Sequence, residues 1–183
     1  LELDAEYVRS GLSKDLFNVI VARRLVPKNG VRFAVEAMGF LKKQGETGLH
    51  LTIVGDGPEI DLMRSLVEKL DVSEMVTLVG AIDHSDVDAF YKATDVVLMP
   101  STRSDDIEEA TSLSMLEGMA CGKVVVASAI GGLKEVIRSG ENGILVDDKR
   151  PEQIASALVQ LRDKDELYQT ISRTAATYAR ERH

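Results

Sequence analysis

Short apolar runs rich in β-branched residues alternate along this chain with longer segments of helical spacing. Continuous apolar runs of four to six residues are typical of strands buried on both faces, and apolar residues three and four apart indicate amphipathic helices. The pattern predicts strands over residues 17–21, 49–54, 76–80, 96–99, 124–127 and 143–146. Helical spacing between strands is clearest at Phe33, Ala37, Met38 and Leu41, and again at Leu62, Met63, Leu66, Val67 and Leu70.

This regular order of strand and helix predicts an α/β fold, a doubly wound, Rossmann-like parallel sheet of about six strands. After the last strand, Pro151 is placed to open a helix that presents Ile154, Leu158 and Leu161 on one face. A second helix is expected from about residue 166 to 180. Residues 1–12 show no clear period, so we expect a linker or a remnant of a preceding segment there, and one domain over residues 13–183.

Composition narrows the class of protein. With 183 residues, of which 44% are hydrophobic and 28% charged, the chain is long enough for one globular core. A formal net charge of -8 argues against nucleic-acid binding, which needs a basic surface. The single cysteine excludes an intramolecular disulfide and fits a reducing compartment. No signal peptide is evident, and no apolar run approaches the roughly 18 residues of a membrane helix. Both ends look cut, so we expect a piece of a longer polypeptide.

The loops that follow the strands are the candidate sites, because ligands of open α/β sheets bind beyond the carboxyl ends of the strands. After the first strand, the cations Arg23, Arg24 and Lys28 lie just before a helix. Cations beside the free N–H groups of a helix start suit a diphosphate. A solvated basic loop explains the same residues equally well.

The other loops carry weaker patterns. Gly55-Asp56-Gly57-Pro58 begins like a dinucleotide fingerprint without its third glycine, which favours a tight turn with Pro58 at the first helical position. Asp105 and Asp106 have no third ligand at a useful spacing, so a solvated acidic loop is favoured over a metal site. Gly131-Gly132 is either an ordinary turn or a point of close backbone approach.

Three further side chains have no expected role in catalysis. His50 falls in a strand, and His84 precedes Ser85, which we expect to cap the next helix. Neither histidine has a partner that suggests catalysis. Cys121 is expected to pack as a small apolar residue beside Gly122.

Two carboxylates eight positions apart, Glu109 and Glu117, flank a helix start that Thr111 or Ser112 can cap. Glu117 lies in a run of Leu, Met, Ala and Gly. A carboxylate in apolar surroundings is costly unless a specific partner satisfies it. The sequence therefore predicts a functional role for Glu117.

These motifs together resemble those of a known family. The chain is similar, from about residue 17 to 183, to the carboxyl-terminal, donor-binding half of retaining glycosyltransferases of the GT-B fold, family 4 ("group 1"). The resemblance rests on Arg24-Leu25-Val26-Pro27 with Gly30, Ile53-Val54-Gly55-Asp56-Gly57-Pro58, Val79-Gly80, Ala93-Thr94-Asp95-Val96, Pro100-Ser101, Glu109 and Glu117, Met119-Ala120-Cys121-Gly122, Gly131-Gly132, Glu135 and Asn142-Gly143.

The resemblance implies a role for each candidate residue. Glu109 would contact hydroxyls of the donor sugar, and Glu117 would accept hydrogen bonds from the nucleotide ribose. Arg24 and Lys28 would neutralise the diphosphate in place of a metal, and Arg23 belongs to the same donor-binding set. The remaining members act through the backbone: amides around Ser112, Leu113 and Ser114 toward the phosphates, and Gly80 and Ala81 toward the base.

The sequence departs from the family pattern at several of these positions. Asn29 stands where the family usually has Lys, and Arg23 stands where Gly is common. Thr111 and Ser112 replace a common Phe and Gly, and Val124 replaces a common Pro.

By this resemblance, the parent protein transfers a hexose-type sugar from a UDP- or GDP-linked donor to an acceptor with retention of configuration. It needs no metal or other cofactor. An absent amino-terminal domain would bind the glycan or lipid-linked acceptor, so this piece alone would bind nucleotide at most and be inactive. A cytoplasmic location follows, with contact to the inner membrane face left open. Two alternatives remain: a GT-B nucleotide-sugar epimerase, and a non-catalytic interaction module with a degenerate donor site.

Overall fold

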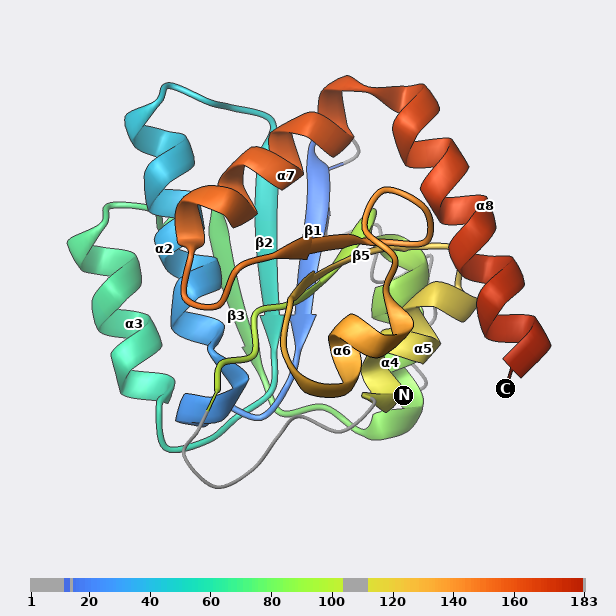
Figure 1. Ribbon diagram of the computed structural model, residues 1–183. Coiled ribbons are helices and arrows are strands. Elements are labelled where there is room, and N and C mark those ends of the chain that lie inside the picture. Colours follow the sequence, from blue (N-terminus) through green and yellow to red (C-terminus); the bar gives the residue numbers. More distant parts are fainter. Residues whose placement is uncertain (1–11, 14, 104–111, 183) are drawn as a thin grey trace.

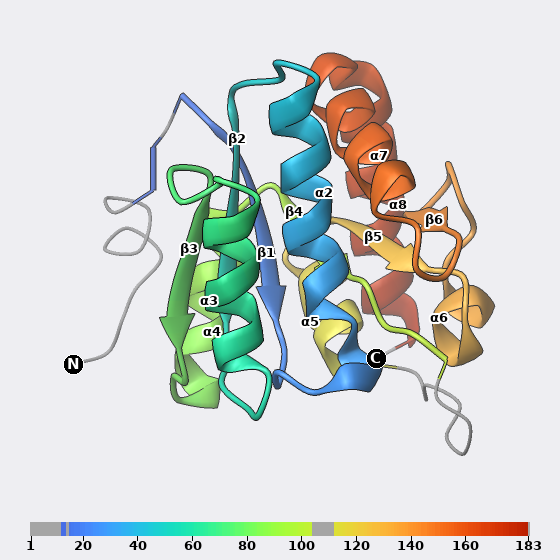
Figure 2. The ribbon, with the colours of Figure 1, turned by 90° about the vertical axis from the view of Figure 1, so that its left-hand side faces the viewer.

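Six parallel strands form one sheet within the residues that the computed structural model describes, which are 12, 13, 15–103 and 112–182 (Figures 1 and 2). The order across the sheet is β3-β2-β1-β4-β5-β6. The predicted doubly wound α/β fold is confirmed, and every predicted strand is present with bounds that agree to within one residue. The strands are β1 (Phe17–Ala22), β2 (Leu49–Val54), β3 (Val76–Gly80), β4 (Val96–Met99), β5 (Val124–Ser128) and β6 (Ile144–Val146).

Helices cover both faces of this sheet. They are η1 (Pro27–Asn29), α2 (Val31–Lys43), α3 (Ile60–Lys69), α4 (His84–Ala93), α5 (Leu113–Ala120), α6 (Gly131–Val136), α7 (Pro151–Asp163) and α8 (Asp165–Arg182). One core cluster joins the sheet to α2, α3 and α7, and a second joins it to α4, α5 and α6. The last helix reaches both clusters, with Ile171 in the first and Ala175 in the second. The predicted pair of carboxyl-terminal helices is confirmed.

The central strand β1 shows why continuous apolar runs mark this kind of sheet. Val19, Ile20 and Val21 are all fully buried. Val19 and Val21 belong to the core cluster on one face, and Ile20 belongs to the cluster on the other. Because successive side chains point to opposite faces, a strand covered on both sides must be apolar at every position. Burial of each such side chain stabilises the fold by about 1.5–3 kcal/mol.

Two predicted helix starts are wrong. The helix α3 begins at Ile60, two residues after Pro58, because the Ile60 amide donates to the Gly57 carbonyl and closes a turn first. The helix α4 begins at His84 with Asp83 as N-cap, so Ser85 lies inside its first turn and does not cap it. Ser112 is the N-cap of α5 as expected, while Thr111 and the predicted linker, except Leu12, lie outside the described residues.

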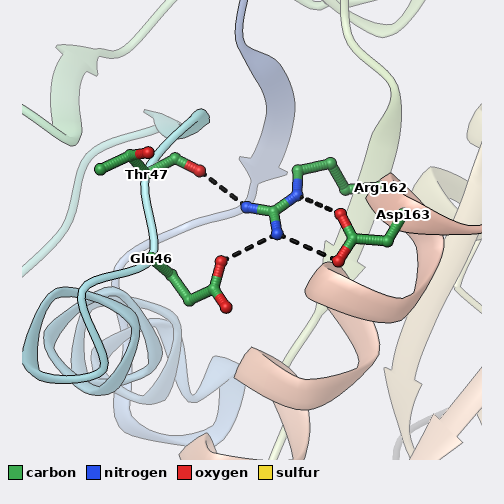
Figure 3. Close-up of polar contacts among 4 residues, drawn as sticks. All are labelled: Glu46, Thr47, Arg162 and Asp163. Atoms are coloured by element: carbon green, nitrogen blue, oxygen red, sulfur yellow. Dashed lines mark hydrogen bonds and ion pairs between the residues drawn. The ribbon is translucent and has the colours of Figure 1, made fainter.

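Arg162, near the end of α7, fastens that helix to the loop between α2 and β2 (Figure 3). Its guanidinium donates to the Thr47 carbonyl at 2.7 Å, to Glu46 Oε2 at 2.8 Å and to both carboxylate oxygens of Asp163 at 2.7 and 3.2 Å. The bond to Asp163 is the main cause that raises the pKa of Arg162. The Arg162 side chain is 22% exposed, so water only partly screens these contacts.

Substitution of Arg162 by alanine is expected to lower the free energy of unfolding by about 1 kcal/mol, since it removes several charge-assisted contacts at once. Arg162→Lys keeps the charge but loses the planar fork, and its loss should be intermediate. Urea unfolding measures both. Arg64→Ala is the control, because Arg64 pairs with Asp61 at 65% and 89% exposure. An equal effect of Arg64→Ala and Arg162→Ala would show that the cluster adds nothing to an ordinary surface pair.

Candidate functional site

A pocket of about 340 Å³ opens at the carboxyl ends of β1 and β2, beside the point where the strand order reverses between β1 and β4. This is where doubly wound sheets bind ligands. Its walls come from the ends of these two strands, the loop after β3, and the helices α4 and α5. Five of the predicted site residues line it: Arg23, Arg24, Ala81, Ser114 and Glu117.

Glu117 lies on the pocket side of α5 and pairs with His84, the first residue of α4. The distance from His84 Nε2 to Glu117 Oε1 is 3.4 Å, and the two side chains are 75% and 29% exposed. Glu117 lies in an apolar helical run as expected and borders a second, apolar pocket, but its carboxylate reaches the first pocket while Met115 and Met119 face the core. The carboxylate is an accessible acceptor on the pocket wall.

Tyr91 is a pocket residue that the sequence analysis missed. Its side chain is 1% exposed, and its hydroxyl lies near Ser114 without a well-formed hydrogen bond among the described residues. Burial raises the pKa of Tyr91 to about 12, so the group is a neutral hydroxyl at neutral pH. A buried polar atom without a partner is uncommon in native proteins and is often a place that a ligand satisfies.

His84 and Tyr91 share a signal in the sequence that could have revealed them. Together with Val87 they occupy positions i, i+3 and i+7 of α4, and all three line the pocket. That spacing marks one face of a helix. A mixed polar and apolar face next to a sheet's carboxyl edge would have pointed to the site.

The loop after β1 brings two cations to the pocket in different ways. Arg23 is half-buried, and its NH1 donates to Ser101 Oγ at 2.9 Å while its NH2 donates to Asn29 Oδ1 at 2.9 Å. Arg24 also lines the pocket but is exposed. Lys28 lies in η1, is exposed, and is not among the residues that line the pocket.

Hydrogen bonds fasten this loop to both neighbouring loops. The Leu25 amide donates to the Asp56 carbonyl after β2 at 2.9 Å. The Thr102 amide, after β4, donates to the Lys28 carbonyl at 2.9 Å. The loop after β1 is therefore held from two sides.

The other predicted residues lie around the pocket rather than in it. Gly80 ends β3 immediately before Ala81, and Ser112 is the N-cap of α5. Leu113 is 63% exposed and faces a second pocket of about 310 Å³, which Leu116, Ala120 and Ala179 also line. Glu109 lies outside the described residues, so the structure gives no position for the first carboxylate of the pair. The roles assigned to all these residues stay predictions.

The helix α5 approaches the sheet closely at Gly118. A Cβ at that position would lie 2.7 Å from Val97 Cγ2 of β4. The missing side chain lets α5 lie flat on the sheet and brings Ser114 and Glu117 to the pocket wall.

Within the described part of the chain, no three His, Cys, Asp or Glu side chains are grouped so that they could hold a metal ion. Cys121 packs against the second core cluster as expected, and its Sγ also donates to Asp88 Oδ1 at 3.2 Å. Burial raises the pKa of Cys121 to about 11, which keeps the thiol protonated at neutral pH. Among the described helices, none combines the length and apolar character of a membrane span.

The sheet and its flanking helices define a Rossmann-like domain with a pocket at the switch point, the architecture of the carboxyl-terminal half of a GT-B protein. The family model described as "Glycosyl transferases group 1" matches residues 5–178. The chain belongs to this glycosyltransferase family, as the sequence motifs predicted.

Curated relatives agree with this assignment. The chain is 33% identical over 172 residues to the D-inositol 3-phosphate glycosyltransferase of Paenarthrobacter aurescens, covering 92% of this chain and 41% of that protein. It is 30% identical over 145 residues to the GDP-mannose-dependent alpha-(1-6)-phosphatidylinositol monomannoside mannosyltransferase of Mycobacterium tuberculosis. That match covers 78% of this chain and 37% of the mannosyltransferase. The chain thus spans about two fifths of the length of these relatives.

Solved structures share the fold. Anabaena Alr3699/HepE in complex with UDP and glucose superposes with a TM-score of 0.87 at 25% identity, over 98% of this chain and 48% of that one. The carboxyl-terminal domain of a glycosyl transferase group 1 family protein (LpcC) from Francisella tularensis gives a TM-score of 0.79 at 25% identity. The match covers 91% of this chain and 85% of that domain.

Proposed function

We propose that this chain is the donor-binding domain of a retaining, metal-independent glycosyltransferase that takes a hexose-type sugar from a nucleotide-diphosphate sugar. The observation that carries the proposal is the pocket at the switch point, which sets the cations Arg23 and Arg24 and the carboxylate of Glu117 around one cavity. A nucleoside diphosphate has a complementary layout, with hydroxyl donors on its ribose and negative charge on its phosphates. The complexes of Anabaena Alr3699/HepE with UDP and with UDP-glucose support the same class of ligand.

Each wall of the pocket has a task in this proposal. Glu117 accepts hydrogen bonds from ribose hydroxyls, and these displace its contact with His84. The cations of the loop after β1 and the first amides of α5 attract the diphosphate, since a helix N-terminus favours negative charge. The buried Tyr91 hydroxyl is available to a ligand group that enters the pocket.

Transfer would then depend on positioning and on charge stabilisation. As the bond between sugar and diphosphate breaks, negative charge grows on the leaving group, and fixed cations and amides lower the barrier. Glu109 would orient the donor sugar through its hydroxyls. The acceptor, a glycan or a lipid-linked sugar, would be bound by a part of the protein outside this chain. We also propose that the protein acts in the cytoplasm.

Calorimetric titration of the chain with UDP, GDP and ADP tests the site. We expect one of the three to bind, and Glu117→Ala to weaken it at least tenfold, because hydrogen bonds to a charged group are worth about 1.5–3 kcal/mol each. Glu152→Ala is the matched control, an exposed carboxylate on α7 that is remote from the pocket residues.

Three results would contradict the proposal. Binding that Glu117→Ala leaves unchanged would remove the ribose contact from this pocket. Failure of all three nucleotides to bind would favour the alternative of an interaction module that keeps the fold without a donor. A donor analogue converted to its epimer by the full-length protein would instead favour the epimerase.

A further inference from the structure

Two tyrosines of this chain differ in what their hydroxyls meet. The Tyr168 hydroxyl, on the half-buried face of α8, donates to the Asp95 carbonyl at 2.8 Å. The Tyr91 hydroxyl, on α4, is buried without a well-formed hydrogen bond among the described residues. A buried polar group that lacks a partner destabilises the folded state, and a phenylalanine at position 91 would avoid that loss. Packing in the core therefore accounts for the Tyr91 ring but not for its hydroxyl.

Tyr91 belongs to the wall of the pocket at the switch point. It lines this pocket together with Ser114, in the first turn of α5, and Glu117 on the same helix. Burial raises the pKa of Tyr91 to about 12, Ser114 and Arg23 oppose that rise, and the Glu117 carboxylate adds to it. The hydroxyl therefore keeps its proton at neutral pH, and both the carboxylate and the cation are close enough to influence it.

The chemistry of a nucleoside diphosphate restricts what this hydroxyl can bind. Its proton needs an acceptor, whereas the ribose hydroxyls act as donors toward Glu117 in the proposed site. Ionised phosphate oxygens accept hydrogen bonds and form stronger ones than neutral acceptors do. The α-phosphate is the one attached to the ribose, so it is the phosphate nearest to Glu117. Since Tyr91 lines the same wall as Glu117 and the first turn of α5, the α-phosphate is the acceptor that best suits it.

We propose that Tyr91 is a further donor-binding residue, whose hydroxyl donates to an oxygen of the α-phosphate. This inference rests on the proposed donor site. The bound phosphate supplies the acceptor that the hydroxyl lacks in the free chain. The contact comes from a neutral group at the buried end of the pocket, and it is separate from the contacts of the loop after β1.

The test compares Tyr91→Phe with the wild-type chain, using UDP, UMP and uridine and the corresponding guanine and adenine compounds. For the base that binds, Tyr91→Phe should weaken the diphosphate and the monophosphate by the same factor, about tenfold or more, because both carry the α-phosphate. The nucleoside should bind both proteins equally. Calorimetry measures the nucleotides, and ligand-observed NMR measures the weaker nucleoside. The thermal unfolding midpoint of the unliganded chain should stay or rise, because no formed hydrogen bond is lost.

Tyr168→Phe is the matched control, because it also removes one hydroxyl and keeps the ring. It should lower the unfolding midpoint, since it breaks the bond to the Asp95 carbonyl. It should leave every affinity unchanged, because Tyr168 is not among the residues that line the pocket. The two tyrosine variants should therefore have opposite profiles of stability and affinity.

The outcomes separate this inference from the proposed function. If the wild-type chain binds none of the nucleotides, both are overturned. If Glu117→Ala weakens binding but Tyr91→Phe does not, only the role of Tyr91 is overturned. A loss confined to the diphosphate, or an equal loss for the nucleoside, would overturn the α-phosphate contact. Failure of Tyr91→Phe to fold, or a lower midpoint with unchanged affinity, would assign the hydroxyl to an internal bond with Ser114 and overturn it too.

Discussion

Replacement of Gly30 by alanine is expected to lower the free energy of unfolding by about 4 kcal/mol, as the sum of two costs. Gly30 joins η1 to α2 with φ at +61°, a left-handed conformation that costs an L-residue about 1–2 kcal/mol. A Cβ there would also lie 2.0 Å from the Pro100 carbonyl oxygen and 2.9 Å from Thr102 Cγ2. Relief of that overlap needs a backbone shift, typically worth a further ~1–3 kcal/mol.

Gly45→Ala and Gly48→Ala separate the two costs. Both glycines also have positive φ, at +72° and +80°, but a Cβ at either would meet nothing within 4 Å. Each should therefore show only the conformational cost of about 1–2 kcal/mol. Denaturant unfolding of the three variants gives the comparison. If Gly30→Ala lowers the free energy of unfolding no more than these two substitutions do, the close approach to Pro100 does not add to the loss of stability.

Met119→Ala is expected to lower the free energy of unfolding by about 3 kcal/mol, within the range of large-to-small core substitutions. Met119 is fully buried on α5 in the cluster between that helix and the sheet. Its truncation leaves a cavity that neither the sheet nor α8, which also contacts α5, can easily fill.

Leu113→Ala on the same helix is the matched comparison, because Leu113 is 63% exposed. Its effect should stay within about 0.5 kcal/mol. Met119→Leu, which keeps most of the volume, should cost less than about 1.5 kcal/mol. Equal losses for Met119→Ala and Leu113→Ala in urea unfolding would mean that the packing of α5 is not the source of its stability.

Strand positions could be predicted from the sequence because a strand buried on both faces must be a continuous apolar run. Each residue of β1 from Val19 to Val21 has to be apolar, whatever its distant neighbours are. The first residues of the helices were harder to predict from the local sequence. Pro58 and Ser85 are both residues that favour a first turn, yet the backbone turns at Gly57 and at Asp83 decide where α3 and α4 begin.

The position of the pocket could be predicted from the sequence, but the contacts inside it could not. Loops at the carboxyl ends of the strands follow from the fold class. Two hydrogen-bond partners of Arg23, however, are Asn29 six positions away and Ser101 seventy-eight positions away, and only the folded chain brings them together. The contact of Glu117 with His84 is of the same kind, since the two residues lie on different helices and meet only in the folded chain.

Hydrogen bonds join the loop after β1 to the loops on either side of it. The Leu25 amide donates to the Asp56 carbonyl, and the Thr102 amide donates to the Lys28 carbonyl. The order of this loop is therefore acquired when the chain folds, before any ligand arrives. A site preorganised in this way spends little of its interaction energy on immobilising its own loop. In the proposed donor site, more of the attraction between cation and phosphate would then remain as affinity.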